Sequence, residues 1–262
     1  MVLGFEINAL LAAAAFVAGM IDAVAGGGGL ITIPALLATG VPPIQALATN
    51  KLQSTFGTAG AVIASARKGH LSLKGFVAPT IASFAGAALG AFLLTQIDSA
   101  FLAGFMPVLL IAMAIYFVVA PKMGDEDRHG RVLPGFLIGV AFVIGTYDGF
   151  FGPGTGSFFT TALVALFGFG MIRAVARAKL LNLASNLAGL TVLMVGGHVI
   201  WVTGLLMAAA SIAGGQVGAH ATMRFGAGVA RPLLIVMSLI LTGKLLADPA
   251  NPLTHMVLTA LN

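Results

Sequence analysis

The sequence predicts an all-α, polytopic membrane protein built from two copies of one structural repeat, and three observations predict this class. Only 8% of the 262 residues are charged, where a soluble domain carries about 25%. The mean hydropathy is +1.05, so a 26.4 kDa globule could not bury all of its apolar surface, and lipid must cover the rest. The third observation is a pattern that recurs along the chain. An ordinary soluble enzyme is excluded.

The composition also limits the ligands. There is no cysteine, which excludes disulfides and thiol nucleophiles, and the five histidines are scattered, so we expect no metal site and no cofactor. The net charge of +5 is too dilute for a nucleic-acid surface. We therefore expect membrane lipid and a small ligand as partners, and no nucleic acid. The composition leaves a homo-oligomer open.

An internal repeat divides the chain. At a spacing of 126 residues Asp22 recurs as Asp148, and at a spacing of 128 residues Lys51 recurs as Lys179, each within a longer matching pattern. The two halves are therefore homologous. The predicted parts are a first membrane repeat (1–122), an inter-repeat loop (123–131) and a second membrane repeat (132–262).

Each half contains one broken apolar stretch and then three long apolar runs. The broken stretches, 8–39 and 132–167, contain glycine-rich segments that disfavour a regular helix: the first knot (residues 22–29) and the second knot (residues 148–157). Each long run has about 18 to 25 residues, enough to cross a ~30 Å hydrocarbon core as a helix. The six runs are 45–66, 73–94, 100–120, 171–195, 200–223 and 229–246.

The basic residues decide between two topologies. If each broken stretch is a re-entrant hairpin, nine of ten basic residues in loops and at helix ends share one face, whereas full crossings divide them seven against three. The positive-inside rule favours the hairpins. With one hairpin and three crossings per half, the second copy must be inverted, both termini face outward, and the inter-repeat loop is cytoplasmic. Inverted repeats with broken helices are typical of secondary transporters, whose site lies at the repeat interface.

Five ionisable residues remain inside the apolar segments. Insertion scales give a cost of ~2.5–3.5 kcal/mol for a charged residue at a helix centre, so such groups face the protein interior or snorkel to the interface. Snorkelling of the lysines stays open. Symmetric recurrence, with amide side chains nearby, favours a polar cavity instead. The five residues are Asp22, Lys51, Asp148, Arg177 and Lys179, and the amides are Asn50, Gln53, Asn182 and Asn186.

The two knots predict an anion site. Each ends one arm of a hairpin and starts the return arm, which places two helix N-termini with free N–H donors at a shared cavity. Gly28 and Gly29 in the first knot, and Thr155 and Gly156 in the second, would then contact the anion. The alternative interpretation treats the glycines as close-packing turns. The acids that begin the knots would couple transport to H⁺ or Na⁺, pair with a lysine, or cap the return arms.

Several segments resemble the TauE/SafE family of membrane permeases, over nearly the whole chain. They are residues 19–34, 48–53, 147–154 and 178–186, which include Asn50-Lys51-Leu52-Gln53 and Tyr147-Asp148-Gly149. The sequence is most similar to the YfcA-type branch of the bacterial inner membrane. The resemblance implies transport of sulfite, sulfoacetate or other sulfonates. Arg177 departs from the Thr or His expected near that position, and a third cation there would shift substrate choice.

These observations together predict a transporter rather than an enzyme: an exporter of a small anion such as sulfite or an organosulfonate, working by alternating access. A passive anion channel and a carboxylate transporter stay open, and an intramembrane enzyme using Ser157 and His198 is the least favoured alternative. The predicted substrate-binding residues are Asn50, Lys51, Gln53, Arg177, Lys179, Asn182, Asn186, Gly28, Gly29, Thr155 and Gly156, with Asp22 and Asp148 as coupling residues.

Overall fold

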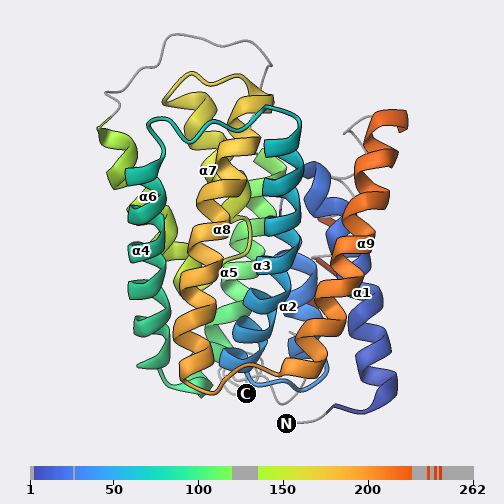
Figure 1. The fold of residues 1–262 in the computed structure, drawn as a ribbon. Helices are drawn as coiled ribbons and strands as arrows, with labels where there is room; N and C mark the ends of the chain where they lie inside the picture. The colour runs from blue at the N-terminus through green and yellow to red at the C-terminus, as the bar shows by residue number, and fades with distance from the viewer. Residues whose placement is uncertain are drawn as a thin grey trace.

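The computed structural model describes residues 3–25, 27–119, 135–225, 235–236, 239–240 and 242–243. Over these residues the protein has nine α-helices and no strand, which confirms the all-α class (Figure 1). The inter-repeat loop predicted at 123–131 lies outside the described residues, and so does most of the crossing helix predicted at 229–246.

Of the helices in the described residues, five belong to the first half and four to the second. In the first half they are α1 (Phe5–Ala25), α2 (Gly29–Ala38), α3 (Pro43–Arg67), α4 (Val77–Thr95) and α5 (Ser99–Val119). In the second half they are α6 (Phe136–Phe150), α7 (Thr155–Ala165), α8 (Met171–Val195) and α9 (Trp201–Phe225).

Five of the described helices, α1, α4, α5, α8 and α9, are long and apolar enough to cross a membrane. Helix α3 also has 25 residues, but polar side chains such as Asn50, Lys51 and Gln53 make it less apolar. Helices α2, α6 and α7 are shorter, with 10, 15 and 11 residues. At 1.5 Å per residue these three reach only about 15–22 Å. Helix α1 is longer than one arm of a symmetric hairpin because no glycine-rich segment interrupts it before Ala25.

The broken stretches return to the end of the bundle from which they start. In Figure 1, α1 begins at the end where α3 begins, and α6 begins at the opposite end, where α8 begins. The loop between α3 and α4 and the loop between α8 and α9 likewise lie at opposite ends. Two oppositely oriented copies would produce this arrangement.

Equivalent helices pack in equivalent ways. Helix α1 lies along α9, helix α6 lies along α4, and α3 and α8 meet between these pairs. Glycines allow close backbone approach in both pairs. A Cβ atom on Gly86 or Gly90 of α4 would meet the carbonyl oxygen of Phe142 or Thr146, and one on Gly214 or Gly218 of α9 would meet that of Phe16 or Met20.

Replacing Gly86 by Leu should therefore destabilise the α4–α6 contact. The added side chain would overlap the backbone of α6, and overpacking of this kind costs about 1–3 kcal/mol or more. Thermal unfolding in detergent would show a lower midpoint. The control is Gly139→Leu on α6, where a Cβ atom has open space around it. Equal shifts in both variants would contradict the close approach.

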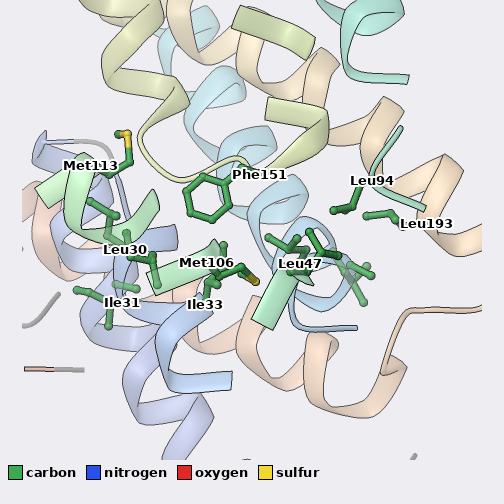
Figure 2. Packing of buried hydrophobic residues seen from close by; sticks show 14 of the residues in the cluster. Leu30, Ile31, Ile33, Leu47, Leu94, Met106, Met113, Phe151 and Leu193 are labelled. Atoms are coloured by element: carbon green, nitrogen blue, oxygen red, sulfur yellow. The ribbon is translucent and has the colours of Figure 1, made fainter. Parts of the chain in front are cut away.

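An apolar core fixes the second knot. Phe151, directly after α6, packs in one cluster with Leu30 and Ile33 of α2, Met106 and Met113 of α5, and further buried side chains (Figure 2). Phe151 is 2% exposed. Because the cluster joins α2 and α5 of the first half to the second knot, it holds the two halves together beside the polar centre.

Candidate functional site

A polar cavity lies where the two knots meet α3, α8 and α9. Its volume is ≈ 40 Å³, room for about three water molecules. Backbone and side chains from both halves form its wall, so it lies at the predicted repeat interface. The lining residues are Asp22, Gly27, Gly28, Gly29, Asn50, Lys51, Gln53, Ser54, Gly57, Thr58, Asp148, Gly152, Gly154, Thr155, Gly156, Asn182, Asn186 and Ser211.

A buried ion pair crosses from α3 to the second knot. Lys51 Nζ lies 2.8 Å from Asp148 Oδ2, and both side chains are 2% exposed. The other carboxylate oxygen, Oδ1, accepts a hydrogen bond of 2.8 Å from the hydroxyl of Thr155, the first residue of α7. Asp148 therefore neutralises a lysine of the first half and binds the side chain of the first residue of the return arm of its own half.

The side chain of Lys51 fits into a slot formed by two glycines. Gly152 has φ +98°, and a Cβ atom there would lie 3.0 Å from Lys51 Nζ. A Cβ atom on Gly189 of α8 would lie 3.3 Å from Lys51 Cε. Any larger residue at either position would press on the lysine, so the glycines define its place next to Asp148.

A second ion pair joins a lysine of the second half to an acid of the first half. Lys179 Nζ of α8 donates to Asp22 Oδ2 at 2.7 Å, and the two side chains are 9% and 32% exposed. Asp22 Oδ1 accepts from the backbone N–H groups of Gly27 (2.9 Å) and Gly28 (3.2 Å). This carboxylate therefore caps the start of α2 and is the more exposed of the two acids.

The two pairs resolve alternatives that the sequence left open. Lys51 and Lys179 do not snorkel, because each is paired with an acid of the opposite half. Both acids pair with a lysine, and Asp22 also accepts from the backbone N–H groups that precede α2. The knots also serve as turns, since Gly27, Gly152 and Gly154 have positive φ angles. Gly28, Gly29 and Gly156 also line the cavity, so the same segments form the turns and part of the cavity wall.

Amide and hydroxyl groups complete the wall. Asn50 Oδ1 accepts from the hydroxyl of Thr32 at 2.6 Å, and Gln53 Nε2 donates to Ser211 Oγ at 3.1 Å. Asn186 Nδ2 donates to Asn182, to its carbonyl oxygen at 2.8 Å and its Oδ1 at 3.0 Å. Amides supply donors and acceptors without net charge, so they can bind the oxygen atoms of an oxyanion beside the ion pairs.

Arg177 does not line the cavity. Its guanidinium carbon lies 5.0 Å from the ring centroid of Phe76 and 4.4 Å from that of Phe169, in a cation–π arrangement at the start of α4. The expectation of a third cation at the site is thus not met by this structure. The reason is helical geometry: Arg177 and Lys179 are two residues apart on α8, and positions i and i+2 face different directions.

Seven wall residues were absent from the predicted site: Ser54, Gly57, Thr58 and Ser211, and within the knots Gly27, Gly152 and Gly154. The first three follow Asn50 and Lys51 at spacings of three, four and seven, which place them on the same side of α3, so helical periodicity could have found them. Ser211 recurs in the first half as Ser83, but that partner donates to the carbonyl oxygen of Leu181 and does not line the cavity, so the repeat alone could not assign Ser211 to the wall.

The Ser157 and His198 pair considered for an enzyme is also separated. Ser157 follows Gly156, which lies against Asn182 near the middle of α8. His198 comes after the end of α8 at Val195, about 20 Å further along that helix. A histidine at that distance cannot act as a base for the serine.

Comparisons with known proteins identify the family of this chain. The family described as "Sulfite exporter TauE/SafE" matches residues 11–245. A probable membrane transporter protein, ORF9, of Sinorhizobium sp is 48% identical over 96% of this chain and 97% of its own length. A probable membrane transporter protein of Haemophilus influenzae is 45% identical, over 94% and 97%.

The probable membrane transporter protein YfcA of Escherichia coli is 42% identical, over 89% of this chain and 87% of its own. No solved structure matches. The family match spans most of the chain, and relatives above 40% identity align over nearly their whole length. The chain is therefore a multi-pass membrane protein that belongs to the TauE/SafE family of membrane transporters.

Proposed function

We propose that this protein exports a small oxyanion, sulfite or an organosulfonate, across the bacterial inner membrane by alternating access, as a secondary transporter. In this proposal the two halves are inverted copies, both termini lie outside, and the substrate binds between the knots. One observation carries the proposal: a cavity between the two halves is lined by the ion-paired Lys51, by two acids, by amides and by the starts of two short helices, while Lys179 pairs with the wall residue Asp22.

The size of the cavity supports a small substrate. A volume of ≈ 40 Å³ suits an occupant of about three to four non-hydrogen atoms, such as sulfite. Sulfoacetate is larger, so it would need the halves to move apart. The Lys51–Asp148 pair, at 2% exposure, closes one part of the wall, which favours a carrier with a closed centre over an open channel.

Flux of labelled sulfite in proteoliposomes tests the proposal. Lys179→Ala and Lys51→Ala should each lower the rate at least tenfold. A tenfold loss corresponds to an increase of roughly 1.4 kcal/mol in the activation free energy. Arg177→Ala is the control, because its guanidinium stacks on Phe76 and Phe169 away from the cavity. Undiminished flux in both lysine variants would remove the site. Uptake of a carboxylate with no uptake of sulfite or sulfonate would change the substrate class.

A further inference from the structure

We infer that the anion binds together with a proton and that Asp22 is the residue that takes up this proton, an inference that rests on the proposed anion transport. The reason is the charge of the site. Among the described residues, two carboxylates and two ammonium groups meet at the cavity, so its formal charge is zero. An anion gains little from lysines whose charge is already compensated.

Protonation of one carboxylate changes this balance. The proton binds Oδ2 of Asp22, the ion pair with Lys179 Nζ is lost, and the ammonium group keeps its three protons without a counter-charge. The incoming anion then supplies the missing negative charge. Proton and anion therefore favour each other's binding, and the site returns to zero charge once both are bound.

The two acids are not equivalent candidates. Asp148 is almost completely buried and pairs with a lysine held in the slot between Gly152 and Gly189. The side chain of Asp22 is 32% exposed and lines the cavity, so water can deliver a proton to it. Asp22 is therefore the acid whose partner can be exchanged.

This difference is also present in the sequence. By the spacing of 128 residues, Gly189 aligns with Ala61, and by the spacing of 126 residues, Gly149 aligns with Ala23. Gly189 lies against both Gly149 and the stem of Lys51. Gly152, the other glycine of the slot, aligns with Gly26, so the first half keeps only one of the two slot glycines, and the slot around Lys51 is not fully reproduced around Lys179. The Lys51–Asp148 pair therefore serves as the fixed pair.

The surroundings of Asp22 favour H⁺ over a metal cation. Its Oδ1 already accepts from Gly27 and Gly28, and its Oδ2 from Lys179. A cation bound by oxygen needs several oxygen ligands and would compete with all three donors. A proton needs only Oδ2 and leaves the two backbone hydrogen bonds in place.

Other titratable groups near Asp22 are few, and controls can separate them. Helix α2 has none, and α9 has none between Trp201 and Gly218, although His220 and Arg224 follow. Helix α1 itself carries Glu6 in its first turn, and Lys179 comes from α8. Lys51 and Asp148 complete the set at the cavity. Glu6→Gln and His220→Gln are therefore the matched controls for Asp22→Asn.

Calorimetric binding between pH 5 and pH 8 to the purified full chain tests the inference. Two probes are used: sulfite, and methanesulfonate, which stays ionised throughout this range. Methanesulfonate should bind about tenfold more tightly for each unit of falling pH, with one proton taken up from solution per anion bound. In Asp22→Asn the pH dependence should disappear, and the affinity at pH 8 should exceed that of the wild type at the same pH.

The outcomes are distinct. Binding of methanesulfonate without proton uptake by the wild type overturns proton coupling, and this measurement requires no variant. A pH dependence that persists in Asp22→Asn, or disappears in Glu6→Gln or His220→Gln, overturns the assignment to Asp22. Failure of both anions to bind at every pH contradicts the proposed anion transport itself.

Discussion

Replacing Asp148 by Asn is expected to lower the free energy of unfolding by about 3–5 kcal/mol. Asparagine keeps an acceptor for the hydroxyl of Thr155, so the variant removes little except the charge. Lys51 would then hold an ammonium group at 2% exposure with no counter-charge. Unfolding of the full chain in detergent micelles titrated with dodecyl sulfate, followed by circular dichroism, measures the loss.

Two comparisons separate loss of the ion pair from a general defect. Asp22→Asn should cost clearly less, because its carboxylate is 32% exposed and partly hydrated. Adding Lys51→Met to Asp148→Asn should recover most of the stability, since an apolar side chain of similar length replaces the unpaired charge. Equal losses for the two acids, or no recovery in the double variant, would contradict the buried pair as a structural element.

Replacing Gly152 by Ala should affect stability and transport together. The residue has φ +98°, a conformation that disfavours side chains by roughly 1–2 kcal/mol. Its new Cβ atom would also lie 3.0 Å from Lys51 Nζ and press the ammonium group away from Asp148. We expect sulfite flux in proteoliposomes to fall by at least about tenfold, because small displacements at a binding site have effects of this size.

Gly197→Ala is the matched control. Gly197 also has a positive φ, +72°, but no atom lies within 4 Å of the added Cβ, so this variant tests backbone strain alone. Its free energy of unfolding should fall only by the cost of the strained backbone, and its sulfite flux should stay normal. If Gly152→Ala and Gly197→Ala lose the same stability and show the same flux, the contact between Gly152 and Lys51 does not affect transport.

Much of this arrangement could be predicted from the sequence. Apolar runs of membrane-spanning length located most of the long helices, and glycine-rich segments located the breaks before α2 and α7. The recurrence of Asp22 as Asp148 and of Lys51 as Lys179 identified the charged centre, because ionisable groups at membrane depth need partners.

The partners themselves could not be predicted. The repeat gives each half one acid and one lysine, and a pairing within each half fits the sequence as well as the observed pairing between halves. That choice depends on how α3 and α8 cross between the two knots, which is a tertiary property. The unequal exposure of the two pairs likewise depends on what packs around each one, including the slot at Gly189.

The central claim is that the transported anion binds in the cavity between the two halves. A crystal structure of the full chain grown at low pH with selenite, a sulfite analogue whose selenium scatters anomalously, tests it most directly. We predict one anomalous peak in the cavity, between Gly28 and Gly156 and near Lys179, in a molecule whose α3 and α8 run in opposite directions. A peak only at the lipid-facing surface, or an empty cavity at saturating selenite, would contradict the claim.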